Sequence, residues 1–124
     1  MISGVGIDVI EVERVKEKIE KEQGFRELVF GKKEIEYCEP KAHKYEHYAA
    51  RFAAKEAFFK ALGTGWATGT FYNEIEILGD DSGKPEIHIS GTTAETLQHI
   101  LLAKINISIS HLKNTAAAVV IIEN

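Results

Sequence analysis

Residues 44–62 read KYEHYAARFAAKEAFFKAL, and this stretch decides the fold that we expect. Apolar side chains recur along it at helical spacing, and Gly63 stands where a helix commonly ends. The pattern predicts a long apolar helix over these residues that leaves little polar surface. Arg51 and Lys55 project away from the apolar stripes, so we interpret them as solvated surface charges.

Glu56 and Lys60 are the unusual charges of this helix, because the neighbours of Glu56 three and four residues away are Phe52, Ala53, Phe59 and Lys60 itself. Burying a charge costs several kcal/mol unless a partner or a metal compensates it. A plain Glu–Lys pair one turn apart would also explain the two residues. Both interpretations stay open at this level.

The segments around the long helix follow no regular strand–helix alternation. Helices are expected over residues 11–22, 25–30, 32–39 and 91–103, and strands over 2–7, 74–78, 86–89, 105–110 and 115–122. This order predicts an α+β fold, in which a largely antiparallel sheet packs against one long apolar helix and shorter helices. We expect residues 1–124 to form one domain.

Composition narrows the classes of function. The chain has 124 residues, 44% of them apolar, and a formal net charge of -4. A negative chain is not expected to bind nucleic acid, and no apolar run approaches the ~20 residues of a membrane helix. Cys38 is the single cysteine and no secretory signal pattern appears, so we expect a cytoplasmic protein.

Asp8 follows the first expected strand and could be a turn or capping residue. A second carboxylate, Glu56, would make it half of a magnesium site, since Mg²⁺ often takes one or two carboxylates and completes its shell with water and phosphate oxygens. The glycine-rich loop over residues 63–70 could offer backbone N–H groups to phosphate, although it is not a P-loop.

Four motifs now stand in order along nearly the whole chain. They are Gly6-Ile7-Asp8-Val9 with Arg14, RFAAKEAFFKALGTG over residues 51–65, Gly83-Lys84-Pro85, and Ser108-Ile109-Ser110-His111 followed by AAAVV over residues 116–120. Together they resemble the holo-acyl-carrier-protein synthase family of phosphopantetheinyl transferases. The block with Lys55-Glu56-Ala57 and the following Lys60 is its most specific part.

The resemblance implies an activity and a site. Members of this family transfer phosphopantetheine from coenzyme A to a serine of apo-acyl carrier protein, supporting fatty acid biosynthesis, and release adenosine 3′,5′-bisphosphate. They are typically homotrimers with active sites between subunits. By similarity, Asp8 and Glu56 hold Mg²⁺, and Glu56 and Lys60 are catalytic. Coenzyme A would contact Lys60, Gly63, Thr64, Gly65, Gly83, Lys84, Pro85 and His111.

One stretch departs from the family pattern. Relatives often carry several basic residues before the long helix, whereas this chain has Lys41-Ala42-His43-Lys44. The resemblance transfers the coenzyme A role of that stretch to His43 and Lys44. The acceptor of the serine proton also stays open between Glu56 and a metal-bound water.

Basic residues on the first expected helix point to a partner. Arg14, Lys18 and Lys21 recur at helical spacing, and Phe25 and Arg26 follow the next glycine. The resemblance makes this stripe a dock for the acidic carrier protein, although interleaved glutamates also fit a solvated helix face. Another magnesium-dependent nucleotide- or phosphate-transferring enzyme, or a non-catalytic oligomeric binding module, is the alternative function.

Overall fold

The computed structural model describes residues 1–65 and 68–124. Trp66 and Ala67, which belong to the loop expected near phosphates, lie outside the described residues. The main sheet has three antiparallel strands in the order β1-β5-β4, with bounds β1 Ile2–Glu11, β4 Lys104–His111 and β5 Thr115–Glu123. The two chain ends lie side by side, and the Met1 amino group donates to the Asn124 backbone oxygen at 3.1 Å.

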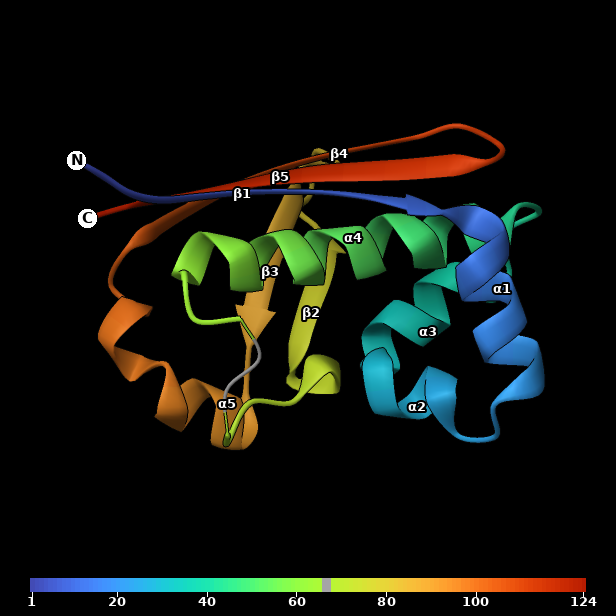
Figure 1. Ribbon diagram of the computed structural model, residues 1–124, viewed down its shortest axis with the longest axis horizontal. Coiled ribbons are helices and arrows are strands. Elements are labelled where there is room, and N and C mark those ends of the chain that lie inside the picture. The colour runs from blue at the N-terminus through green and yellow to red at the C-terminus, as the bar shows by residue number, and fades with distance from the viewer. Residues whose placement is uncertain (66–67) are drawn as a thin grey trace.

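The helix α4 (Lys44–Leu62) runs beneath the three-stranded sheet (Figure 1). A hairpin of β2 (Ile75–Gly79) and β3 (Pro85–Ile89) crosses the other side of α4. Three helices gather at the N-terminal half of α4, namely α1 (Val12–Lys21), α2 (Phe25–Val29) and α3 (Lys32–Cys38). The short α5 (Gly91–Thr96) lies toward its other end, and two 3₁₀ turns, η1 (Tyr72–Glu74) and η2 (Gln98–Ile100), complete the chain.

The contact between β1 and α4 is unusually close because β1 lacks side chains there. A Cβ atom on Gly4 would lie 1.9 Å from the Ala61 carbonyl oxygen, and one on Gly6 would lie 1.9 Å from that of Ala57. Both distances are far below a van der Waals contact. The glycines therefore let the strand backbone rest directly on the helix, which fixes the depth at which Asp8 sits.

The α+β class with antiparallel pairing is confirmed, as is the extent of the long helix. Gly63 ends that helix at φ 80, the left-handed conformation that glycine adopts without strain. The expectation that α4 is simply apolar is not confirmed. Arg51 and Lys55 are buried rather than solvated, at 6% and 0% exposure.

Two boundaries differ from expectation. The strand β1 continues to Glu11, so Asp8 lies inside it, paired with Ala118 of β5, and not at its end. The helix expected over 91–103 ends at Thr96 and gives way to η2. Threonines at positions 92, 93 and 96 have low helix propensity, and Thr93 binds Glu74 instead of facing solvent.

The outer face of the three-stranded sheet carries a row of exposed apolar side chains. Val5, Ile7 and Val9 are 58–63% exposed, and β5 places Val119 opposite Ile7. No described helix lies over this face in Figure 1. Within residues 1–65 and 68–124, no helix has both the length and the apolarity that crossing a membrane requires.

Candidate active site

Asp8 and Lys60 meet at the edge of the main sheet. The Lys60 Nζ donates to Asp8 Oδ1 and to the Ile7 backbone oxygen, each at 3.0 Å. The Lys60 side chain is 57% exposed, whereas that of Asp8 is only 17% exposed. The sequence placed Lys60 among core positions, and this is wrong: it stands at the surface with its charge over the half-buried carboxylate.

Glu56 lies one helical turn before Lys60 and is half-buried. Its Oε2 accepts a hydrogen bond from the Tyr72 hydroxyl at 3.0 Å. Burial, and then the charge of Glu56, raise the pKa of Tyr72, so this hydroxyl stays a donor at neutral pH. The charge of Asp8 raises the pKa of Tyr72 further, as the smallest of these effects.

These two carboxylates fit a magnesium ion better than a zinc ion. The described residues contain no cluster of three or more His, Cys, Asp or Glu side chains suited to a metal. A protein site of two carboxylates, completed by water and substrate phosphate, is the arrangement that Mg²⁺ commonly uses. Asp8 and Glu56 offer hard oxygen donors of this kind, and Lys60 adds a positive charge beside them.

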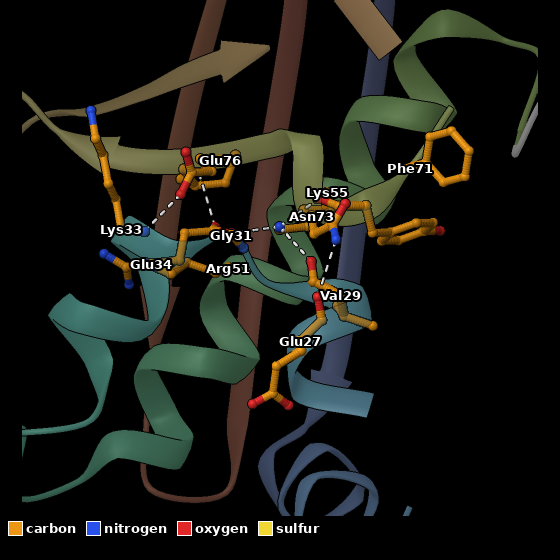
Figure 2. Close-up of polar contacts among 12 residues, drawn as sticks. Glu27, Val29, Gly31, Lys33, Glu34, Arg51, Lys55, Phe71, Asn73 and Glu76 are labelled. Atoms are coloured by element: carbon orange, nitrogen blue, oxygen red, sulfur yellow. Dashed lines mark hydrogen bonds and ion pairs between the residues drawn. The ribbon is translucent and has the colours of Figure 1, made fainter. Parts of the chain in front are cut away.

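Lys55, the residue directly before Glu56, ties the same turn of α4 to neighbouring elements. It is fully buried, and its Nζ donates to the Val29 oxygen at 2.7 Å, to the Tyr72 oxygen at 2.8 Å and to Glu34 Oε1 at 2.6 Å. Figure 2 shows Lys55 reaching the α2–α3 segment beside Glu34 and Val29. The Glu34 carboxylate also accepts from the backbone N–H groups of Gly31 and Ile77.

Burial lowers the pKa of Lys55 and raises that of Glu34. Three acceptors around the ammonium and three donors around the carboxylate oppose that effect, so we treat the pair as charged. The pair joins α4, α3 and η1 at one point. Sequence reasoning missed it because Lys55, like Arg51 one turn before it, was interpreted as a solvated surface charge.

The loop after α4 extends from the C-terminal end of the helix. Gly63, Thr64 and Gly65 are exposed, and the Thr64 hydroxyl donates to the Gly65 oxygen at 3.3 Å. The Gly63 N–H bonds to the Lys60 oxygen at 3.1 Å, which ties the loop to the residue that contacts Asp8. The described part of the loop therefore starts at the helix turn that carries Lys60.

A separate cavity of about 450 Å³ opens on the opposite side of α4. It gathers three of the residues expected to contact coenzyme A, Gly83, Pro85 and His111, although they come from the β2–β3 hairpin and from β4. Tyr37, His47 and Arg51 line the same cavity. Sequence reasoning did not single out these last three.

Arg51 brings a positive charge to this cavity, whose lining also includes the acidic Asp80. Its guanidinium stacks 4.3 Å from the centre of the Tyr37 ring, and its Nη1 donates to the His47 oxygen at 3.3 Å. Its buried Nε has no hydrogen-bond acceptor among the described residues. A buried donor without a partner is costly, so an anion entering the cavity would satisfy it.

Two histidines border Arg51. His47 and His111 meet edge to face, with ring centres 5.1 Å apart, and His111 Nδ1 lies 2.9 Å from Glu46 Oε1. Burial lowers the pKa of His47, and the nearby His111 and Arg51 lower it further. Negative charge brought into the cavity would reverse this effect and favour protonation of His47.

The remaining residues expected to bind coenzyme A lie outside this cavity. Lys84 lines an adjacent hollow of about 380 Å³ beside β3 and β4. His43 and Lys44 line a larger hollow of about 790 Å³ at the N-terminus of α4. His43 nevertheless lies close to the cavity, because its Nδ1 is 3.9 Å from Glu46, the partner of His111.

The two groups of residues occupy opposite faces of α4. His47 precedes Glu56 by nine residues, and Arg51 precedes Lys60 by nine residues, which is about two and a half helical turns in each case. The sheet separates them as well, because β1 carries Asp8 at one edge and β4 carries His111 at the other. A single chain therefore presents the carboxylate pair and the basic cavity in different directions.

The three basic residues that were expected to form a docking stripe lie on α1. Arg14, Lys18 and Lys21 line one shallow hollow together with Glu17 and Glu22. Lys18 forms an exposed ion pair with Glu22 at 3.5 Å, which offsets part of the positive charge.

Phe25 and Arg26 make contacts within the chain that differ from those of the basic stripe. The ring centres of Phe25 and Phe52 of α4 lie 6.4 Å apart, and the Lys18 ammonium lies over the Phe25 ring. Arg26 pairs with Glu27 at 2.7 Å and with Glu39 at 3.2 Å, so it ties α2 to the end of α3. Its charge is already largely matched within the chain.

The chain was compared with known proteins. Residues 4–120 match the sequence model of the 4′-phosphopantetheinyl transferase superfamily. A holo-[acyl-carrier-protein] synthase of Cytophaga hutchinsonii is 46% identical, with 98% of this chain and 97% of the relative covered.

Solved structures agree with that match. A holo-(acyl-carrier-protein) synthase of Bacillus anthracis, in complex with CoA (3′,5′-ADP), is 35% identical at a TM-score of 0.82, covering 100% of this chain and 98% of the other. The holo-[acyl-carrier-protein] synthase of Neisseria meningitidis is 30% identical at a TM-score of 0.88, with both chains fully covered. Over this extent and at this identity, the chain belongs to the 4′-phosphopantetheinyl transferase superfamily and, within it, to the holo-[acyl-carrier-protein] synthases.

Proposed function

We propose that this chain transfers phosphopantetheine from coenzyme A to a serine of an apo-acyl carrier protein, in a Mg²⁺-dependent reaction that supports fatty acid biosynthesis. The observation that carries the proposal is the contact of Lys60 with Asp8, 52 positions away in the chain, at a point one helical turn from Glu56. Cys38 is buried and is the single cysteine of the chain, so no internal disulfide is needed, which suits the cytoplasm, where we place the reaction.

The reaction exchanges one phosphorus–oxygen bond for another. The serine oxygen attacks the phosphorus that bears the pantetheine arm, and the bond from that phosphorus to the bridging oxygen breaks. The bonding electron pair leaves with adenosine 3′,5′-bisphosphate, and the serine proton passes to a base, for which Glu56 is a candidate. Mg²⁺ held by Asp8 and Glu56 would neutralise charge on the pyrophosphate oxygens.

Lys60 supports the same step through its charge. Its ammonium is exposed and ends beside Asp8, so it can turn toward a phosphate without crossing the protein interior. A donor aimed at the oxygen where charge develops contributes more to the transition state than to the bound substrate. The Gly63-Thr64-Gly65 loop begins at the same helix end and supplies further N–H groups to the phosphates.

The basic cavity suits the nucleotide end of coenzyme A. Arg51 brings an unpaired guanidinium N–H, and Gly83, Pro85 and His111 supply a wall into which a planar base could fit. Lys84, His43 and Lys44 border the neighbouring hollows and would add positive charge around a ribose phosphate. This assignment leaves the pyrophosphate to the carboxylate pair.

Assembly of several copies can bring the carboxylate pair and the basic cavity together, although a single chain keeps them apart. In a closed ring of three copies, the carboxylate edge of one subunit can face the basic cavity of the next. The apolar row Val5, Ile7 and Val9 is the surface that such a homotrimer would bury. We propose a homotrimer with its active sites between subunits.

The carrier protein would approach along α1, with Arg14, Lys18 and Lys21 attracting its acidic surface. Phe25 adds an apolar contact, and rings connect it inward through Phe52 to Tyr72 beside Glu56. We assign Arg26 a supporting role in this dock through its hold on Glu39. The docking helix and the carboxylate pair thus belong to the same subunit.

The direct test is to incubate the purified chain with coenzyme A, Mg²⁺ and several apo-carrier proteins. Mass spectrometry should show a carrier heavier by one phosphopantetheine group, and EDTA should abolish the gain. Nucleotide release without a modified carrier would favour another phosphotransferase. Binding without any product would favour a non-catalytic module, and either result would overturn the proposal.

A further inference from the structure

Tyr72 is fixed against α4 by its ring. The ring stacks on Phe52 with centres 6.1 Å apart at 26°, and it lies 5.2 Å from the ring of Phe59. Phe52 precedes Glu56 by four residues and Phe59 follows it by three, so all three helix residues share one face. The tyrosine ring therefore spans the helix turn that carries Glu56.

The backbone of Tyr72 is held to the same turn. Its carbonyl oxygen accepts from Lys55 Nζ at 2.8 Å, and Lys55 is the residue directly before Glu56. Lys55 is itself immobilised by Glu34 and by the Val29 oxygen. Ring and backbone together leave the Tyr72 hydroxyl little freedom of position.

The hydroxyl ends on Glu56 Oε2 at 3.0 Å. Within the described residues, Oε1 of the same carboxylate accepts no hydrogen bond, so it stays available to a cation. A glutamate side chain loses considerable rotamer freedom when it is ordered. The hydrogen bond from Tyr72 to Oε2 orders the Glu56 side chain before the ion binds, so ion binding does not carry that entropy cost. The same bond sets the direction of Oε1.

We propose that Tyr72 is a positioning residue that orients Glu56 for Mg²⁺, holding Oε2 so that Oε1 faces the ion. This inference rests on the proposed magnesium site. Groups that hydrogen-bond to ligating carboxylates commonly change metal affinity about 10- to 100-fold when they are removed. If Tyr72 served only to fill space, replacing it with phenylalanine would leave the metal affinity unchanged.

The experiment replaces only the hydroxyl, in Tyr72→Phe. Mn²⁺ serves as the probe because it takes the same oxygen ligands as Mg²⁺, and the electron paramagnetic resonance signal of free Mn²⁺ reports its binding without any turnover. The matched control is Tyr48→Phe, which removes the hydroxyl of a tyrosine on α4 that is bound to another glutamate, Glu39. Thermal unfolding verifies that both variants fold.

We expect Tyr72→Phe to weaken Mn²⁺ binding about 10-fold and Tyr48→Phe to leave it within twofold. In the transfer assay, added Mg²⁺ should restore much of the activity of Tyr72→Phe. If Glu56→Gln loses Mn²⁺ while Tyr72→Phe binds it like the unmodified chain, the positioning role is wrong and the proposed transfer stands. If the unmodified chain neither binds Mn²⁺ nor modifies a carrier, the metal site fails and the positioning role falls with it.

Discussion

The Lys60 ammonium lies 3.0 Å from the Asp8 carboxylate, although 52 positions of the chain separate the two residues. The helix α4 and the strand β1 come close enough for this contact because Gly4 and Gly6 carry no side chains. One charge of the pair is exposed and the other is mostly covered. Lys60 thus neutralises Asp8 while remaining free to turn toward an arriving phosphate.

Replacing Lys60 by Gln should lower kcat about 100-fold, because it removes a charged donor from the leaving phosphate. The KM for the carrier protein should change little, since the docking stripe is untouched. Steady-state kinetics of carrier modification measure both. Lys33→Gln, an exposed lysine of α3, is the control, and equal losses in the two variants would contradict a specific role for Lys60.

Arg14→Glu should raise the KM for the carrier about 10-fold while the KM for coenzyme A stays nearly constant, because the change reverses a charge on the docking face. Added salt should narrow the difference between variant and parent. Lys16→Glu makes the same charge change on another side of α1 and should have a smaller effect. A parallel rise in both KM values for Arg14→Glu would argue against docking on α1.

Ile7→Lys should prevent trimer formation, since it places a charge in the centre of the exposed apolar row. Size-exclusion chromatography with light scattering would report the change in mass, and transfer activity should fall with it. Leu102→Lys alters a fully exposed side chain in the turn before β4, outside the apolar row, and serves as the control. A trimeric Ile7→Lys variant would show that other surfaces hold the subunits together.

Mixing two inactive variants tests the division of the active site. Glu56→Gln disables the carboxylate half, and Arg51→Met disables the basic cavity on the opposite face of α4. In random mixed trimers about one quarter of the sites would pair two intact halves, so activity should reappear after subunit exchange. Mixtures that stay as inactive as their components would place both halves within one subunit.

Glu34→Gln should lower the free energy of unfolding by about 3–5 kcal/mol, because it leaves the buried Lys55 ammonium without its counter-charge. Urea unfolding followed by circular dichroism measures the loss. Glu36→Gln changes an exposed glutamate of the same helix and should have almost no effect. Similar unfolding midpoints for the two variants would mean that the ion pair contributes little.

The sequence predicted the helix of residues 44–62 to the residue, because its apolar spacing is strong and Gly63 ends it. It predicted less well which charges that helix buries. Arg51 and Lys55 became buried because a tyrosine ring, a carboxylate and backbone oxygens from other elements surround them. Such partners come from tertiary structure, and periodicity along a single helix does not show them.

The candidate site was likewise predicted only in part from the sequence. Family motifs placed Asp8, Glu56 and Lys60, and the structure shows Lys60 on Asp8. The role of Tyr72 could not be seen, since its hydroxyl reaches Glu56 only after η1 is tied to α4. His47 and Arg51 offered a usable signal, because each precedes a candidate catalytic residue by nine positions and so must face the other way.

Along β1, three consecutive residues serve two tasks. Ile7 and Val9 point outward on the apolar row, and Asp8 between them contacts Lys60. Gly6 seats this strand directly on α4, so no layer of side chains lies between them to absorb a shift. In the proposed trimer, strain arising where subunits touch would therefore reach the carboxylate with little attenuation, which would make the strand a stiff mechanical link between the proposed quaternary state and the placement of the proposed ion.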